Sequence, residues 1–380
     1  MSFSRCLINT IDTNNHSNKM IIDMKQLNSR RRTRRASSSS PSQSSPSTAS
    51  SLTENDQNGD LNRELAEYAR ARVGSLNFSR FMKNNSEEFV AENLFKGAIY
   101  IAQHNNADLV EEEVVRKLDE IVQTIERELI TEDNEERFPL RTMKKISKIL
   151  FEQMLFKGNS ENYYDANNSC VDKVLETKTG IPITLSLIYM ECAKRVGINM
   201  VGVNLPGHFM IRPLLDECEI MVDCFNKGQI LFVEDAEEML SKLYYGVGGG
   251  EENTNGGGEK VTIDRSFLKE KALNPRTFYT RMITNLKSIY FTKGDYKLAL
   301  MMCNYQRSCA PDEKIYAFNC RDSGMCNYLL EQFSDAFADL TEYLDATSEN
   351  IENVEDRRRI EDLREQARVR WFGQREPNIG

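Results

Sequence analysis

The stretch GIPITLSLIYMECAKRVGINMVGVNLPGHFMIRP, residues Gly180 to Pro213, decides the fold of the central part of the chain. Gly180 stands where a preceding helix would end, and Pro182 suits the first turn of the next helix, where its missing N–H costs nothing. Apolar residues on nearly all sides of 183–196 predict a buried central helix. A strand-like run that contains His208, one of three histidines in the protein, comes after it.

A second strand-like run, EIMVDCFNKG, carries Asp223. Because side chains alternate between the two faces of a strand, Met221, Asp223 and Phe225 are predicted to share one face, as His208 and Met210 share one on the first strand. The tight turn NKG leads into QILFV, a predicted third strand. A histidine on one strand and an aspartate on the next are two of the three members of a nucleophilic triad.

The third member of such a triad is missing. Cysteine proteases and transglutaminases place a thiol at a helix N-terminus, where the helix dipole and the histidine lower its pKa. Residues 181–186 open the central helix and contain no cysteine. Thr184 and Ser186 offer hydroxyls there, and Thr184 is the weak nucleophile candidate, since a hydroxyl reacts far less readily than a thiolate. Cys192, about two turns farther on, is predicted to point into packing.

The other polar candidates have structural interpretations. His104 ends a predicted helix, and capping or solvent exposure accounts for it. Asn168 and Ser169 are predicted to cap the helix CVDKVLE. Nine cysteines include no CxxC pair, which favours buried, reduced thiols over zinc ligands or disulfides. Three scattered histidines form no ligand cluster, so the sequence predicts neither a metal nor a cofactor.

Composition limits the classes of function. The protein has 380 residues, 40% hydrophobic and 28% charged, which is ordinary for a globular protein with two or three domains. Residues 1–60 carry eight Lys or Arg against five Asp or Glu, whereas the whole chain has a net charge of −9. The acidic body argues against nucleic-acid binding, which needs a cationic surface. No apolar run is long enough to cross a bilayer.

The chain divides into four segments by composition. Residues 1–60 form a basic, Ser-rich tail predicted to be disordered, and it is either a flexible tail of a cytoplasmic protein or a presequence for a plastid or mitochondrion. Residues 61–245 contain a helical segment followed by the helix and strands described above. Residues 246–260 are rich in glycine and predict a flexible loop. Residues 261–375 are helical.

The last segment nearly repeats itself. NLKSIYFTKGDYKLALMMCNYQRSCAP aligns with RDSGMCNYLLEQFSDAFADLTEYLDATS at an offset of 37 residues. Tyr296 then matches Phe333, and Ala299 matches Ala336. A small residue where two antiparallel helices cross, with an aromatic residue nearby, is typical of tetratricopeptide repeats. Such helices bind proteins or peptides on a concave surface, and a protein or peptide partner is therefore expected here.

The quoted central stretch, together with LFEQMLFKGNSENYYDANNSCVDKVLETKT before it and VDCFNKGQIL after it, resembles the bacterial SirB-like family. That family combines a transglutaminase-like domain with tetratricopeptide repeats, and related domains occur in some eukaryotic F-box proteins. The resemblance covers roughly residues 87–370. It implies an α+β fold of the papain/transglutaminase kind, followed by an all-α region. It also implies that His208 and Asp223 stand at the catalytic positions, with the usual cysteine absent near Pro182.

Two functions remain open on the sequence alone. The first is a non-catalytic interaction or regulatory module, in which His208 and Asp223 form a vestigial site that holds two strands in register. The alternative is a hydrolase or acyltransferase of the transglutaminase/cysteine-protease class, with an unidentified nucleophile. The sequence favours the first, because no thiol accompanies the histidine.

Overall fold

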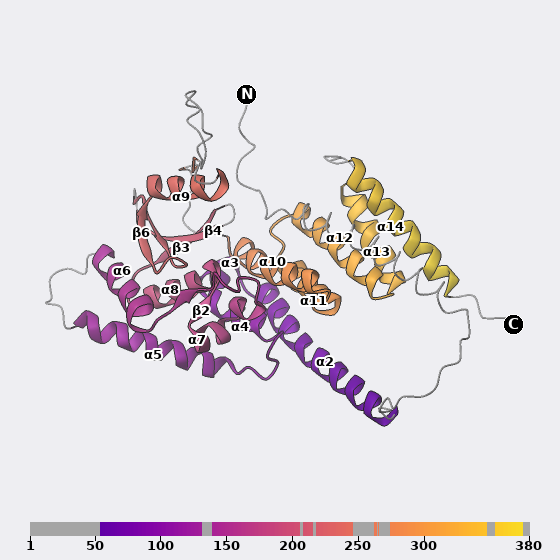
Figure 1. The fold of residues 1–380 in the computed structure, drawn as a ribbon, viewed down its shortest axis with the longest axis horizontal. Coiled ribbons are helices and arrows are strands. Elements are labelled where there is room, and N and C mark those ends of the chain that lie inside the picture. The colour runs from indigo at the N-terminus through magenta and orange to yellow at the C-terminus, as the bar shows by residue number, and fades with distance from the viewer. Residues whose placement is uncertain are drawn as a thin grey trace, which may run out of the picture. The chain divides into compact units, whose positions relative to one another are not determined.

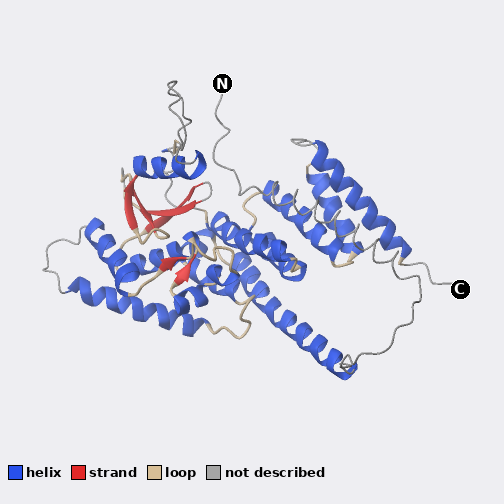
Figure 2. Ribbon diagram, in the orientation of Figure 1, coloured by secondary structure: helices blue, strands red, loops and turns tan. Residues whose placement is uncertain are grey.

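The glycine, the proline and the apolar run of the central stretch produce the expected helix in a computed structural model of the protein, α8 (Pro182–Arg195) (Figures 1 and 2). It is buried on nearly all sides. The structure describes the following residues: 54–130, 139–205, 208–215, 218–245, 262–263, 265, 274–347 and 354–374. The glycine-rich stretch 246–260 and most of the basic tail lie outside them.

The chain forms two compact units. The sheet unit takes Arg80–Asn105 and Leu109–Met282. The helical unit takes the described residues up to Ser79, Asn106–Asp108 and the described residues from Ile283 onward. The boundary between the two therefore falls inside a helix, α10 (Pro275–Lys293), and not in the glycine-rich stretch.

Helices surround α8 in the sheet unit. Acidic residues begin α5, where the helix dipole favours negative charge, and its apolar stripe of Val114, Leu118, Ile121 and Ile125 is buried. A π-helical turn, η1 (Lys148–Gln153), continues directly from α6. The elements before α8 are α2 (Glu54–Asn84), α3 (Glu87–Glu92), α4 (Leu94–Ala102), α5 (Glu111–Ile130), α6 (Pro139–Ser147), η1, β1 (Lys157–Gly158), η2 (Ala166–Ser169), α7 (Val171–Thr177) and β2 (Thr179–Gly180).

Four antiparallel strands follow α8 in the order in which they occur in the sequence. They are β3 (Met200–Leu205), β4 (His208–Pro213), β5 (Ile220–Asp223) and β6 (Gln229–Phe232). Figure 1 shows α8 on one face of this sheet and α9 (Val233–Tyr245) on the other. Met210 and Met221 pack with the apolar side of α9, which fixes the face on which the even-numbered residues of β4 lie. All three predicted strands are present, as β4, β5 and β6, and β3 is a strand that the sequence pattern did not indicate.

From residue 274 onward, the described residues form five helices: α10, α11 (Tyr296–Cys309), α12 (Glu313–Leu329), α13 (Phe333–Ala346) and α14 (Val354–Gly373). The predicted offset of 37 residues reappears in the turns of the two hairpins. Gly294 and Glu331 both have positive φ, 75° and 63°. Asp295 N donates to Tyr290 O at 2.9 Å, as Gln332 N donates to Asn327 O at 2.8 Å. The turns of the hairpins α10–α11 and α12–α13 therefore have the same conformation at matching positions.

Two boundaries of the predicted segments can be compared with the structure. The helix α2 begins at Glu54, so residues 54–60 of the predicted tail are helical. Pro206 and Gly207, at the turn before His208, lie outside the described residues. Within the described residues, no helix combines the length and apolar character needed to span a membrane.

Candidate functional site

The structure brings His208 and Asp223 together. Nε2 of the histidine lies 3.0 Å from Oδ2 of the aspartate, and both side chains are buried, with 10% and 2% of their surface exposed. The two atoms are close but poorly aligned for a hydrogen bond, and Nε2 has no better-placed acceptor among the described residues. The pairing of β4 with β5, in which Ile211 is opposite Val222, places both side chains on one face of the sheet.

The Asp223 carboxylate is also held by its own turn. Its Oδ1 accepts hydrogen bonds from the backbone N–H groups of Phe225 at 3.0 Å and Asn226 at 3.1 Å. Gly228 N donates to Asp223 O at 2.8 Å and closes the turn, with φ of 67° at the glycine. A carboxylate that accepts two backbone N–H groups is fixed in place whether or not the histidine is charged.

Residues in and next to the π-helical segment η1 contact this turn. Ser147, just before η1, donates its hydroxyl proton to Gly228 O at 2.9 Å. The ring of Phe151 fills the space beside Gly228, where an added Cβ would lie 2.5 Å from the ring. π-Helical turns are common at functional sites because the extra residue redirects side chains. Here the turn directs Ser147 and Phe151 toward the loop that carries Asp223.

Arg281, on α10, fixes the strand of His208. Its guanidinium donates to Asn204 Oδ1 at 2.6 Å, to Leu205 O at 3.3 Å and to His208 O at 3.0 Å. It also lies 6.0 Å from the centre of the Phe209 ring. One side chain thus joins the end of β3 to the start of β4, directly beside the histidine.

An aromatic row extends from the histidine, and we define it as Phe225, Tyr163 and Tyr164. The ring of Phe225 stands at 81° to that of His208, with the centroids 6.4 Å apart. Tyr163 makes a similar edge contact with Phe225 at 6.0 Å and with Tyr164 at 5.3 Å. Tyr164 is 68% exposed, so the row runs from the buried histidine to the surface.

Asn168 holds the loop that carries the two tyrosines. Its Nδ2 donates to Asn162 O at 2.8 Å and to Tyr163 O at 3.2 Å, and its Oδ1 accepts from Asn159 Nδ2 at 3.1 Å. The prediction that Asn168 and Ser169 cap the following helix was wrong, because Cys170 is the N-cap of α7. The Asn168 amide binds a loop that lies five to nine residues before it, and rules for helix capping do not describe such a contact.

Thr184 lies at the start of α8 and its hydroxyl is bound to backbone. Oγ1 donates to Asn168 O at 2.6 Å and accepts from Ile181 N at 3.2 Å, which is half of a capping box. Both Thr184 and Ser186 are completely buried. The Ser186 side chain lies beside the Cys224 thiol without a well-aligned hydrogen bond. Neither hydroxyl is presented to solvent.

The cysteines of the sheet unit are also largely inaccessible. Cys170, Cys192 and Cys224 are buried, and Cys218 is partly exposed. Burial raises the pKa of the Cys192 thiol to about 12 and raises the pKa of the Cys170 and Cys224 thiols as well. Thiols with raised pKa values are not thiolates at neutral pH and are poor nucleophiles.

His104 follows one of the two alternatives predicted for it. It is 4% exposed, so solvent exposure was wrong. Its Nδ1 lies 2.6 Å from Ile101 O, a carbonyl of the last turn of α4, which agrees with the capping alternative. Among the described residues, no group of three or more His, Cys, Asp or Glu side chains is arranged to hold a metal ion.

The chain is similar in sequence to several known proteins. Residues 112–284 match the transglutaminase-like superfamily. A UPF0162 protein of Xylella fastidiosa (strain 9a5c) is 33% identical over 210 residues, 54% of this chain and 68% of that protein. The chain belongs to the UPF0162 family. A UPF0162 protein of Vibrio cholerae is 24% identical over 265 residues, 68% of this chain and 88% of the relative.

Similarity also extends outside the bacterial UPF0162 proteins. Human F-box only protein 21 is 29% identical over 177 residues, which are 40% of this chain and 28% of that protein. No solved structure matches the protein. The UPF0162 family resemblance and the transglutaminase-like domain therefore rest on sequence, and the His208–Asp223 geometry is a property of this structure.

Sequence pattern identifies the two strand residues but not the groups that position them. Arg281 is 73 residues from His208 in the sequence, and Ser147 is 81 residues from Gly228. Contacts between residues so far apart leave no periodic signal. The positive φ of Gly228 was detectable in principle from the NKG turn, but its contact with Phe151 was not.

Proposed function

We propose that this UPF0162 protein is a non-catalytic protein-interaction or regulatory module. Its transglutaminase-like domain would carry a vestigial His208–Asp223 site, and its repeated helical hairpins, of the tetratricopeptide kind, would bind a protein or peptide partner. The observation that carries the proposal is the state of Thr184 at the start of α8. Its hydroxyl proton is committed to a backbone carbonyl at 2.6 Å, and its side chain is fully buried.

The chemical reason lies in what acyl transfer requires. A nucleophile must be exposed to substrate and must lose its proton to a base within hydrogen-bonding reach. The hydroxyls of Thr184 and Ser186 are buried, and the pKa values of the buried thiols of Cys170, Cys192 and Cys224 are raised. A histidine and a carboxylate without such a group can still bind a polar ligand or join two strands.

The alternative, a hydrolase or acyltransferase, is favoured by one observation. The 3.0 Å contact of His208 Nε2 with Asp223 Oδ2 puts a carboxylate beside the imidazole, where it would stabilise an imidazolium. We keep this function as the second candidate and place Thr184 as its weak nucleophile. Among the described cysteines, Cys218 is the one that is partly exposed, so its reactivity bears most directly on this alternative.

Covalent labelling tests the proposal. The full-length protein is incubated with an activated ester and with iodoacetamide, and labelled residues are located by mass spectrometry in wild type, His208→Ala and His208→Gln. We expect labelling to be slow and independent of residue 208. Rapid labelling of Thr184, Ser186 or Cys218 that disappears in both variants, while circular dichroism shows them folded, would contradict the proposal and favour the alternative.

A further inference from the structure

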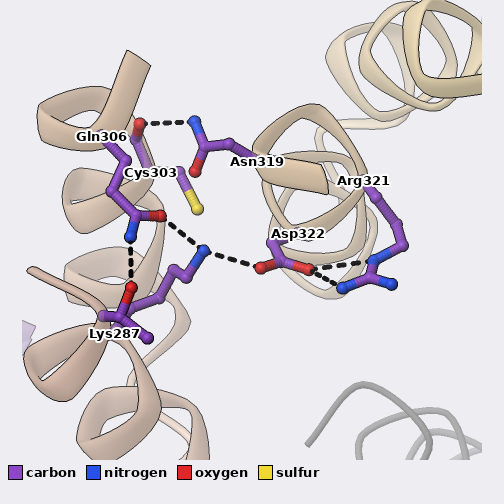
Figure 3. A network of polar contacts seen from close by, with 7 residues as sticks. Lys287, Cys303, Gln306, Asn319, Arg321 and Asp322 are labelled. Carbon is purple, nitrogen blue, oxygen red and sulfur yellow. Dashed lines mark hydrogen bonds and ion pairs between the residues drawn. The ribbon is translucent and has the colours of Figure 1, made fainter. Parts of the chain in front are cut away.

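The helical unit contains a buried polar network between α10, α11 and α12, drawn in Figure 3. Lys287 Nζ donates to Gln306 Oε1 at 2.6 Å and to Asp322 Oδ2 at 2.7 Å. Gln306 in turn donates from Nε2 to Thr284 Oγ1 at 2.7 Å. Lys287 is 6% exposed and Asp322 is 5% exposed. Ionised side chains are seldom buried this far unless they are paired, as these two are.

Arg321 completes the network on the other side of the carboxylate. Its Nε and Nη2 both donate to Asp322 Oδ1, at 3.1 and 3.0 Å. The guanidinium lies 4.9 Å from the centre of the Phe318 ring and 5.8 Å from that of Tyr343. The plane of Arg321 is therefore fixed before any partner arrives, which lowers the entropic cost of binding to it.

The charges of the network do not balance. Burial is the largest single influence and would lower the pKa of Lys287 and raise that of Asp322, but the charges and hydrogen bonds around them, including Arg321 beside Asp322, together shift both pKa values the other way. Lys287 and Asp322 are thus both charged at neutral pH, as Arg321 always is. Among the described residues, Asp322 is the one carboxylate paired with either cation. One positive charge is left without a counterion in a buried position.

Arg321 is itself only 4% exposed, and one edge of its guanidinium has no partner among the described residues. Asp322 occupies the edge formed by Nε and Nη2, and no hydrogen bond from the described residues reaches Nη1. Figure 3 shows Nη1 directed away from Asp322. The edge formed by Nη1 and Nη2 presents two parallel N–H groups, which match the two oxygens of a carboxylate.

The imbalance arises where the two hairpins differ. At the offset of 37 residues, Lys287 corresponds to Gly324, and Cys303 corresponds to Leu340. An added Cβ on Gly324 would lie 2.6 Å from Leu340 Cγ, so the second hairpin has no room for a side chain there. The first hairpin combines a smaller residue, Cys303, with a lysine. A departure from an internal repeat that introduces a buried charge is the kind of local conflict found at functional sites.

We propose that the Nη1–Nη2 edge of Arg321 binds a carboxylate of a protein partner, either an Asp or Glu side chain or the carboxyl terminus of a polypeptide. The proposal rests on the proposed function in taking the ligand to be a protein. A single carboxylate matches the one surplus charge, whereas a phosphomonoester would bring nearly two negative charges. The net charge of −9 on the whole protein also disfavours polyanions such as nucleic acid.

Nuclear magnetic resonance titration of the full-length protein tests the site. The backbone amide resonances of Phe318, Asp322 and Tyr343 are followed at constant ionic strength. The probes are N-acetyl-dialanine for a carboxyl terminus, N-acetylglutamate α-amide for a side chain, N-acetyl-dialanine amide as the uncharged control, and inorganic phosphate. We expect saturable shifts with one or both carboxylates and none with the amide. No saturable shift with either carboxylate, or tighter binding of phosphate, overturns the proposal.

Substitutions test whether carboxylate affinity follows the net charge of the network. Arg321→Lys keeps the charge but loses the paired N–H groups, so carboxylate binding should weaken at least about tenfold. Lys287→Met removes the surplus charge and should also weaken binding, whereas Asp322→Asn adds to it and should strengthen binding. Arg368→Gln removes an exposed arginine paired with Glu365 and should change nothing.

Each variant is first checked for cooperative melting. If Asp322→Asn does not fold, the proposal is still tested by the other two variants: Arg321→Lys should weaken carboxylate binding, and Arg368→Gln should leave it unchanged. Equal binding by wild type and Arg321→Lys would overturn the site even if carboxylates bind. A negative result in this titration would leave the proposed non-catalytic function intact. That function is tested separately, by whether covalent labelling depends on His208.

Discussion

The His208–Asp223 pair places a buried carboxylate on the same face of the sheet as the apolar side chains of Met210 and Met221. Burying an ionised carboxylate is costly unless it is paired and hydrogen-bonded. The two backbone N–H groups of its turn and the imidazole together offset that cost. The pair therefore has a structural consequence that holds whether or not the site reacts.

We predict that His208→Ala lowers the free energy of unfolding by about 1–3 kcal/mol, because it leaves Oδ2 of the buried Asp223 without its partner. Urea denaturation followed by circular dichroism measures the change. In His208→Ala combined with Asp223→Asn the losses should be less than additive, since the two residues share one contact. A His208→Ala midpoint equal to that of wild type would be inconsistent with this role.

His104 predicts a pH dependence of stability. Burial lowers its pKa from 6.5 to about 4, although a backbone hydrogen bond to Ile101 opposes the shift. Because the unfolded protein then binds a proton that the folded protein does not, stability is lost as the pH falls through the interval between these two values. The loss attributable to His104 should be about 2 kcal/mol between about pH 7 and about pH 5.

The measurement is urea denaturation at both pH values in wild type and in His104→Gln. The glutamine does not titrate, so the variant should lose less stability on acidification than wild type, whatever other groups contribute. Identical losses in the two proteins would show that His104 is not the group responsible. The comparison does not depend on how the substitution changes stability at pH 7.

At the scale of elements, the β5–β6 turn depends on the π-helical segment η1. Gly228 has φ of 67°, and a Cβ there would meet the Phe151 ring at 2.5 Å. Gly228→Ala should therefore destabilise the fold by about 2–4 kcal/mol, from backbone strain and overpacking together. Gly197→Ala is the matched control, because Gly197 also has positive φ, 90°, but nothing within 4 Å, and should cost about 1 kcal/mol.

Denaturation midpoints of the two glycine variants, measured side by side, test the contribution of the contact. An equal loss in both would mean that strain alone matters and that the support by Phe151 adds nothing. A Gly228→Ala/Phe151→Leu double variant should recover part of the loss, since the smaller side chain leaves room for the Cβ.

The repeated hairpins make a second prediction at this scale. Ala299 and Ala336 occupy matching positions at the helix crossings, and both are fully buried. Replacing either with leucine should cost about 1–3 kcal/mol, because the crossing has no spare volume. Ala346→Leu, on the exposed side of α13, is the control and should leave the thermal midpoint unchanged. Tolerance of leucine at both crossings would argue against close packing there.

Local pattern predicted α8, β4, β5, β6 and the repeated hairpins, because each has a strong periodicity or clear terminal residues. It also put His208 and Asp223 on one face, since alternation along a strand is a local property. The strand β3 was missed because Met200–Leu205 contains a glycine and an asparagine that weaken its pattern. The roles of Arg281 and of the Lys287 network depend on tertiary contacts, which a single sequence does not reveal.

At the scale of the whole molecule, the helix α10 contributes to both compact units. Pro275–Met282 belongs to the sheet unit and Ile283–Lys293 to the helical unit. Helical segments shorter than about 12 residues are unstable in water without packing partners. If one unit unfolded alone, the half of α10 that belongs to it would lose its packing, and the other half would lose the continuation of its helix. The protein is therefore expected to unfold in one cooperative step.

The single tryptophan tests this expectation. Trp371 lies on α14 in the helical unit, next to Phe337, with the ring centroids 5.9 Å apart, so its fluorescence reports on that unit. We predict that urea transitions followed by Trp371 fluorescence and by circular dichroism coincide. His208→Ala, in the sheet unit, should then lower the fluorescence midpoint as much as the circular dichroism midpoint, whereas Glu152→Gln, at an exposed position of the same unit, should lower neither. A fluorescence midpoint that is the same in His208→Ala and in wild type would mean that the two units unfold separately and that α10 divides at their boundary.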